Sequence, residues 1–303
     1  MSSSGSPSRL EAMFNSPYVR LLRPRQWIKN SFVLVGLLFG GHMGEFHCYL
    51  PVGVVFVLIC AASSAVYVFN DIVDRERDRL HPVKCLRPIP SGQISVRQAS
   101  GISLALAALA LLGSAWLHTG TLICILLYLL NNILYSLWLK DHPLLDVLSI
   151  ASGFILRMLA GVYILGDLPT SWILLCTFFL TLFLGIAKRR AELATVSIQG
   201  HRQRAVLGKY SMPFLDILLG ATGVMTMVSY ALFTALGGKS HAQILTLPFV
   251  FYAVFHYLRL VLVHNYGEDP AEVLLKDPRL IVIIMIWLAF YLAIEQWNPV
   301  LFR

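Results

Sequence analysis

Long stretches without charged residues alternate with short polar segments along most of this chain. Asp, Glu, Lys and Arg are absent from five long runs, at residues 46–70, 98–139, 168–187, 217–238 and 240–258. A helix of about 20 apolar residues crosses the hydrocarbon core of a bilayer, and the longest run is sufficient for two crossings. The pattern therefore predicts an all-α, polytopic membrane protein. Its nine transmembrane helices are expected in a bundle, at about 28–45, 50–72, 98–117, 120–139, 144–166, 169–188, 212–236, 242–264 and 280–299.

The distribution of basic residues predicts the orientation of these helices. Nine crossings place the two ends of the chain on opposite sides of the membrane. With the N-terminus in the cytoplasm, twenty of the 24 Lys and Arg residues fall on the cytoplasmic side. Because cytoplasmic loops carry an excess of Lys and Arg, we expect a cytoplasmic N-terminus.

Composition agrees with this class of protein. Hydrophobic residues make up 57% of the 303 residues and charged residues 13%, against about 25% charge in a soluble domain. The net charge of +8 lies in loops between predicted helices, which indicates topology and not binding of nucleic acid. The five cysteines lack CxxC spacing and a companion histidine pattern, so neither a disulfide framework nor a zinc site is expected.

Residues 1–20 are predicted to form a disordered cytoplasmic tail, and residues 21–303 a single transmembrane domain.

Aspartates close the second predicted helix. Asp71, Asp74 and Asp78 recur at i, i+3 and i+7, so they share one helix face, with Asn70 beside them. Like charges at this spacing repel each other. A divalent cation removes the repulsion, and Mg²⁺ typically takes one or two carboxylates together with substrate phosphates. The spacing therefore predicts a magnesium site at these three aspartates.

A solvated helix extension is the alternative interpretation, with surface ion pairs Asp71–Arg75 and Asp74–Arg77. However, Asp71 directly follows a 25-residue run without charge. Ionisable groups at membrane depth are functional by default. The sequence therefore favours a functional site.

Basic residues gather on the same predicted side of the membrane. Lys84 and Arg87 lie in a loop that contains three prolines, which suits capture of an anion as well as it suits an ordinary basic loop. Lys188 and Arg189 close the sixth predicted helix, where basic residues are also routine topology signals. A diphosphate leaving group requires neutralisation of its negative charge as it departs. A metal ion and basic side chains around a cytoplasm-facing cavity would supply it.

Further polar residues lie around the fifth predicted helix. Tyr135, Lys140 and Asp146 precede it or begin it, and Arg157 lies about three turns inside it. An intramembrane arginine faces the bundle interior and needs a partner. We expect that partner on another helix or in a ligand phosphate.

The segment Asn70-Asp71-x-x-Asp74-x-x-x-Asp78 resembles the motif of the UbiA-type intramembrane prenyltransferase superfamily, whose members are nine-helix bundles. The resemblance covers nearly the whole chain. The segments from His81 to Gly92, around Asp146 and Arg157, and at Lys188-Arg189-Arg190 resemble decaprenyl-phosphate phosphoribosyltransferases more narrowly. Aromatic prenyltransferases of the superfamily carry a second Asp-rich motif where this chain has the last of these segments.

The resemblance implies a Mg²⁺-dependent enzyme that joins phosphoribosyl pyrophosphate to a polyprenyl (decaprenyl) phosphate and releases diphosphate, for cell-wall arabinan synthesis. It implies a bacterial inner-membrane location with the active site facing the cytoplasm, among membrane lipids. A homo-oligomer is compatible with it. The implied roles are magnesium and diphosphate binding by Asn70, Asp71, Asp74 and Asp78, phosphate binding by Lys84, Arg87, Lys188 and Arg189, and completion of the pocket by Tyr135, Lys140, Asp146 and Arg157.

Two other functions remain open from the sequence. One is prenyl transfer from a polyprenyl diphosphate to an aromatic acceptor, against which the missing second Asp-rich motif argues. The other is secondary transport, for which broken helices and midplane polar residues are typical. Here the charges gather at the predicted cytoplasmic rim instead.

Overall fold

The computed structural model describes residues 16–199, 205–237, 240–267 and 269–297, and every regular element in these ranges is helical. The predicted all-α class is therefore confirmed. The chain divides into two compact units. The first unit comprises Met1–Trp138 and Leu156–Asp167, and the second comprises Leu139–Ile155 and Leu168–Arg303.

Eight helices within the described ranges are long and apolar enough to cross a membrane, so the chain is a multi-pass membrane protein. They are Phe46–Val73 (α4), Val96–Leu117 (α6), Thr119–Leu137 (α7), Leu145–Tyr163 (α8), Ser171–Gln199 (α9, spanning part Ser171–Thr195), Met212–Leu236 (α10), His241–Thr246 with Leu247–His264 (η6 and α11) and Pro278–Trp297 (α13). Each corresponds to a predicted helix. The short elements are Pro17–Leu22 (α2), Pro24–Leu34 (η1), Val35–Phe39 (α3), His42–Gly44 (η2), Arg75–Arg79 (α5), Lys84–Leu86 (η3), Leu139–Asp141 (η4), Ala205–Lys209 (η5) and Pro270–Lys276 (α12).

The helix predicted at 28–45 is wrong as a single regular helix. This stretch lies in η1, α3 and η2, and Gly41 turns the chain with a φ of 89°. Tertiary contacts hold η1 in place, since the Asn30 amide donates to Ser63 Oγ of α4 at 3.1 Å. The count of nine crossings and the side of the N-terminus stay predictions.

The disordered tail predicted over residues 1–20 is wrong from Pro17 onward, where α2 begins, and residues 1–15 lie outside the described residues.

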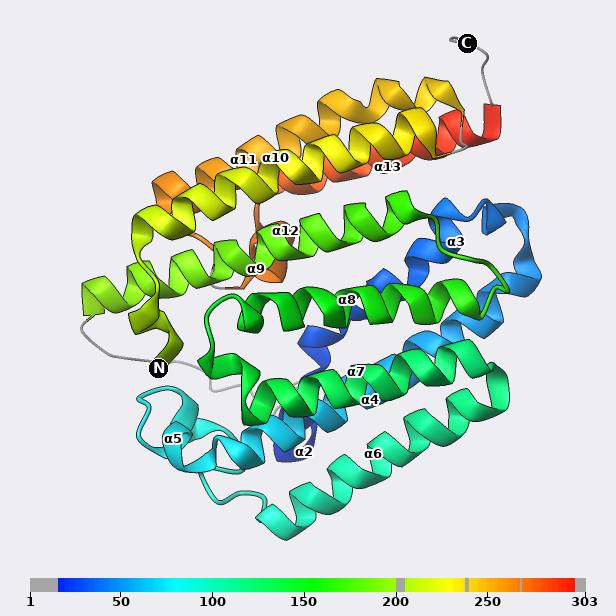
Figure 1. Cartoon of the computed structure of the whole chain (residues 1–303). Helices are drawn as coiled ribbons and strands as arrows, with labels where there is room; N and C mark the ends of the chain where they lie inside the picture. The colour runs from blue at the N-terminus through cyan, green and yellow to red at the C-terminus, as the bar shows by residue number, and fades with distance from the viewer. Residues whose placement is uncertain (1–15, 200–204, 238–239, 268, 298–303) are drawn as a thin grey trace, which may run out of the picture. The chain divides into compact units, whose positions relative to one another are not determined.

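In the first unit α4 packs against α6, α7 and η1, and these helices lie side by side in Figure 1. The predicted break between α6 and α7 is confirmed at His118, which has extended backbone (φ −162°, ψ 133°) and accepts a hydrogen bond from Gly120 N–H at 3.1 Å. α6 has only 11% of its spanning window buried. Most of its apolar surface is therefore free to contact lipid.

Two segments of the first unit approach each other closely at a glycine. A Cβ added to Gly161 of α8 would lie 1.9 Å from Val33 O in η1, and one added to Gly36 would lie 3.1 Å from Gly161 O. Backbone contacts at this distance leave no room for a side chain. We expect Gly161→Ala to lower the free energy of unfolding by about 1–3 kcal/mol, because the two segments must separate.

The melting temperature of the purified protein in detergent measures this effect. Gly101→Ala in α6 is the matched control, since a Cβ there meets nothing within 4 Å and alanine is the better helix former. An unchanged melting temperature in Gly161→Ala would contradict the close packing.

In the second unit α10 packs against α9 and α11, and α11 packs against α13 (Figure 1). The buried core includes Phe183, Leu219, Met227 and Tyr257, with Val147 from the start of α8. α8 thus contributes its first part to this unit and its last part to the first unit. α9 continues well beyond the predicted end at residue 188. Its basic residues therefore lie on a helix.

Candidate functional site

The aspartates of the predicted magnesium site lie in the first unit, where α4 passes into α5. α4 ends at Val73, and Asp74 (φ −87°, ψ 2°) separates it from α5. Helical hydrogen bonds continue across this junction, from Asp74 N–H to Asn70 O (2.9 Å) and from Asp78 N–H to Asp74 O (2.8 Å). Asp71 and Asp78 are buried, with 1% and 5% of their surface exposed, whereas Asp74 is half-buried.

Two arginines hold the buried carboxylates. Arg87 Nη1 lies 3.0 Å from Asp71 Oδ1 and 2.6 Å from Asp78 Oδ2. Arg23 Nη2 lies 2.5 Å from the same Asp71 oxygen. Because one guanidinium nitrogen contacts both carboxylates, Asp71 and Asp78 face a common point, as their spacing predicts. Charge-assisted pairs of this kind are stronger than neutral hydrogen bonds.

The solvated-surface interpretation therefore fails for Asp71, which is buried and does not pair with Arg75. Arg75 contacts Glu76 at 2.5 Å, and Arg79 contacts the same side chain at 3.2 Å. The exposed charges of α5 thus form a surface network beside the buried cluster.

Arg23 is absent from the predicted site residues, and contacts between the N-terminal segment and α4 bring it there. Ser64 Oγ donates to Leu22 O (2.9 Å) and accepts from Trp27 Nε1 (3.0 Å). Arg23 has left-handed backbone (φ 54°) between α2 and η1. Its guanidinium carbon lies 5.3 Å from the ring centroid of Tyr67. The sequence could have indicated Arg23 only as a basic residue just before the first predicted span. Basic residues at that position also occur simply because they orient the span in the membrane.

A small apolar cluster under the loop between α5 and α6 positions Arg87. Ile89 and Ile94 are 2% and 1% exposed and pack with Val68 of α4. Gly92 N–H donates to Ile89 O at 3.1 Å, in a turn that gives Gly92 a φ of 80°. Glycine adopts this conformation without a steric penalty. The loop is thus anchored on the helix that carries the aspartates.

Three further predicted residues lie in the first unit. Asn70, Lys84 and Tyr135 are half-buried, on the last turn of α4, at the start of η3 and near the end of α7. Their roles in binding substrate stay predictions.

Arg157 lies in the part of α8 that belongs to the first unit and is 6% exposed. Its Nε donates to Asn30 Oδ1 (2.9 Å) and its Nη2 donates to Tyr128 OH (2.8 Å). The guanidinium carbon also lies 4.6 Å from the Tyr128 ring centroid, within the range of a cation–π interaction. The partner expected on another element is confirmed, and it includes a neutral amide and a phenol.

A buried ion-pair cluster in the second unit joins the start of α8 to the later part of α9. Arg189 Nε lies 2.5 Å from Asp146 Oδ2, and neither side chain is exposed. Arg189 Nη1 also lies 2.5 Å from Glu192 Oε2. Tyr210 OH donates to the other Asp146 oxygen at 2.8 Å. Burial raises the pKa of Tyr210, so the phenol keeps the proton that it donates.

The remaining predicted residues of the second unit are Lys140 and Lys188. Lys140 is buried in η4 with 7% exposed. Lys188 Nζ is half-buried at 4.0 Å from Glu192 Oε1. Their phosphate-binding roles stay predictions. Arg190, beside the predicted pair, is buried too and lies 2.9 Å from Asp216 Oδ1.

The donor chemistry at the end of α4 fits a hard divalent cation. Asp71 and Asp78 offer oxygen ligands, which Mg²⁺ prefers, and in this structure the Arg87 guanidinium contacts both carboxylates. The three predicted carboxylates do not converge closely in the structure. Among the described residues, the group whose ligand atoms all lie within 4.8 Å of one another is instead His42, Glu45 and Cys48. Metal binding by all three aspartates stays a prediction.

The fold and the site together define a helical membrane protein with paired carboxylates and arginines where one span ends. The UbiA prenyltransferase family matches residues 30–276. The chain belongs to this family, as the motif residues indicate.

Two relatives and a solved structure refine the similarity. The decaprenyl-phosphate phosphoribosyltransferase of Mycolicibacterium smegmatis is 32% identical over 289 residues, which is 90% of each chain. That of Corynebacterium glutamicum is 33% identical over 281 residues, which is 89% of this chain and 83% of the relative. A UbiA homologue from Archaeoglobus fulgidus, solved with GPP and Mg²⁺, matches with a TM-score of 0.72 at 23% identity, over 93% of this chain and 100% of that one. The structural match supports the fold.

Proposed function

We propose that this protein transfers the 5-phosphoribosyl group of phosphoribosyl pyrophosphate to a polyprenyl phosphate and releases diphosphate. The similarity to two decaprenyl-phosphate phosphoribosyltransferases over about nine-tenths of the chain supports this reaction. One observation in the structure carries the proposal. Arg23 and Arg87 both contact the buried carboxylate of Asp71, and Arg87 also contacts Asp78, so a diphosphate bound to the arginines would exchange for these carboxylates.

The two arginines have the properties that a diphosphate site needs. Their side chains are 25% and 29% exposed, whereas that of Asp71 is 2% exposed. The guanidinium groups can therefore reach a ligand from a fixed position. A planar guanidinium binds phosphate with two parallel hydrogen bonds. Arg23 thus joins the phosphate-binding residues that the resemblance implies.

The reaction depends on stabilising the negative charge of the leaving diphosphate more than on proton transfer. The bond between the ribose anomeric carbon and the diphosphate oxygen breaks, and its electron pair leaves with diphosphate. A new bond forms from that carbon to an oxygen of the lipid phosphate. An ionised phosphate is already a nucleophile, so no general base is required. Mg²⁺ bound at the aspartates would supply further neutralisation of the leaving diphosphate.

We infer that the site faces the cytoplasm of a bacterial inner membrane. The Asp-rich end of α4 is followed by α5 and by a loop rich in Arg and Lys. Such loops are cytoplasmic in most polytopic proteins. A cytoplasmic site would meet the soluble phosphoribosyl donor directly, while the lipid acceptor stays in the bilayer.

Purified protein in lipid nanodiscs tests the function directly. Incubation with labelled phosphoribosyl pyrophosphate, Mg²⁺ and decaprenyl phosphate should yield a labelled lipid, and EDTA should abolish it. Excess Mg²⁺ restores the product after EDTA if chelation is the cause. Consumption of a prenyl diphosphate with an aromatic acid, with no labelled lipid from the phosphoribosyl donor, would overturn the proposal. Product that is undiminished by EDTA would remove the metal from the mechanism.

A further inference from the structure

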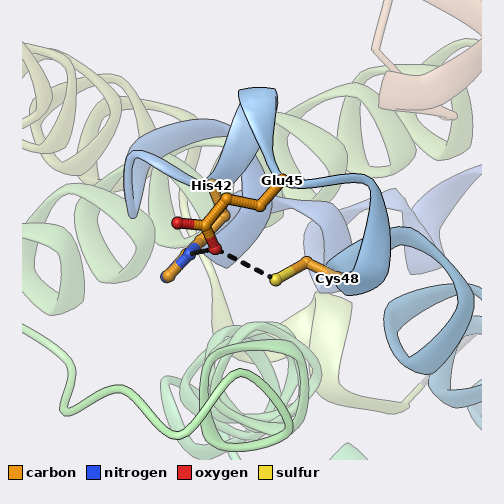
Figure 2. A group of neighbouring side chains, drawn as sticks. All are labelled: His42, Glu45 and Cys48. Atoms are coloured by element: carbon orange, nitrogen blue, oxygen red, sulfur yellow. Dashed lines mark hydrogen bonds and ion pairs between the residues drawn. The ribbon is translucent and has the colours of Figure 1, made fainter.

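A second cluster of ligand-type side chains lies at the opposite end of α4 from Asp71. His42 lies in η2, Glu45 precedes α4 as its N-cap residue, and Cys48 lies in its first turn. Figure 2 shows the Glu45 carboxylate between the imidazole and the thiol. His42 Nδ1 lies 2.8 Å from Glu45 Oε2, and Cys48 Sγ lies 3.4 Å from the same oxygen.

Two further side chains border this group. His42 Nε2 lies 2.8 Å from Asp167 Oδ2, in the loop after α8. His47 Nε2 lies 3.8 Å from Glu45 Oε2. Two carboxylates, those of Glu45 and Asp167, thus face the His42 imidazole.

We propose that His42, Glu45 and Cys48 bind a divalent transition-metal ion of the zinc class. Imidazole nitrogen, carboxylate oxygen and thiolate sulfur together are typical zinc ligands, whereas magnesium selects oxygen alone. The cluster is therefore chemically distinct from the aspartate cluster. The absence of CxxC spacing, from which no zinc site was expected, does not bear on a mixed ligand set of this kind.

The observed distances suit such an ion with small movements. Bond lengths of about 2.0 Å to nitrogen or oxygen and 2.3 Å to sulfur give tetrahedral ligand separations of about 3.3 to 3.5 Å. The 3.4 Å between Cys48 Sγ and Glu45 Oε2 already has this value. The 2.8 Å between His42 Nδ1 and Glu45 Oε2 would have to lengthen by about half an ångström. Glu45 is half exposed and is free to make this adjustment.

The position of the cluster suggests what the ion would do. α4 has 28 residues, which corresponds to a length of about 42 Å, longer than the hydrocarbon core of about 30 Å. The cluster and Asp71 therefore lie near opposite membrane surfaces. An ion there would fasten η2 to the first turn of α4, through residues remote from the aspartate cluster. We assign it a structural role.

Cobalt(II) is a direct probe, because a thiolate ligand gives it a charge-transfer absorption band that oxygen ligands do not. Chelator-treated full-length protein should show this band on addition of Co²⁺, saturating at about one equivalent, and Zn²⁺ should displace it. Cys48→Ser should abolish the band. Cys85→Ser is the matched control, since Cys85 is a free cysteine outside the cluster, and it should leave the band unchanged.

Asp71→Asn serves as a second control, because loss of the aspartate cluster should leave the band intact. A wild-type protein without the band, or a band of equal strength in Cys48→Ser, would overturn the proposal. Should Cys48→Ser fail to fold, Glu45→Gln replaces it, with at least tenfold weaker zinc binding expected by competition with a chelating dye. Unchanged zinc affinity in Glu45→Gln would equally overturn it.

Discussion

Replacing Asp71 with asparagine should lower the rate of lipid-linked phosphoribose formation by about 100-fold or more, a loss typical of removing one charge-stabilising group from an active site. Asp71 is the residue on which both arginines converge, through contacts of 2.5 Å with Arg23 and 3.0 Å with Arg87. Asparagine has the same shape but lacks the charge that orients the guanidinium groups and that a divalent cation requires. The initial rate with labelled phosphoribosyl donor measures the effect.

The folded state should survive this change. Arg87 keeps Asp78 at 2.6 Å, and both arginine side chains remain about one-quarter exposed to water. Glu76→Gln is the matched control, since Glu76 is an exposed carboxylate on the same segment with arginine partners of its own. We expect its rate to stay within about twofold of the wild type, as for most surface changes. A wild-type rate in Asp71→Asn would show that Asp71 only packs against the arginines.

Asp146→Asn should destabilise the protein by about 3 kcal/mol. Asp146 and Arg189 are both fully buried, and removing one partner of a buried pair leaves an uncompensated charge, at a cost of about 3–5 kcal/mol. Glu192 still contacts Arg189 at 2.5 Å, so the expected loss lies at the lower end. The fall in melting temperature in detergent measures it and should be roughly 5–10 °C.

The neighbouring pair provides the control for burial. Asp216 contacts Arg190 at 2.9 Å, but its side chain is 43% exposed. Arg190 also keeps Val261 O and Asn265 Oδ1, both at 2.7 Å. Asp216→Asn should therefore cost at most about 1 kcal/mol. An equal loss in the two variants would contradict the importance of burial at Asp146.

Most helices could be predicted because local signals agreed with the apolar pattern. α10 begins at Met212 and ends at Leu236, as predicted. Ser211 caps its N-terminus by accepting from Phe214 N–H, and Gly237 follows its last residue. The segment at 28–45 is also apolar over most of its length but has a different conformation. There Asn30 and Gly36 make contacts with distant residues that no local signal reveals.

The candidate site could be predicted in part for the same reason. Asp71 and Asp78 lie on the consecutive helices α4 and α5, and the helical hydrogen bonds that continue across Asp74 keep the two side chains facing a common point, as their spacing predicted. Arg23 lies 48 positions from Asp71 in the sequence, and its place depends on the contacts of Ser64 with the N-terminal segment. The partners of Arg157 are likewise remote, at 127 positions for Asn30 and 29 for Tyr128.

The amino-acid sequence alone was sufficient to predict the class of protein, the positions of eight spans and the carboxylates at the end of α4. It could do so because the bilayer acts on each segment separately, and a helix satisfies its own backbone groups wherever its neighbours lie. The pairing of charges, as in Asp71 with Arg23 and Asp146 with Arg189, and the polar groups around Glu45 became known only from the packing of the folded chain. Such pairs depend on the close approach of segments far apart in the chain, because a buried charge is stable only where its partner is within hydrogen-bond distance.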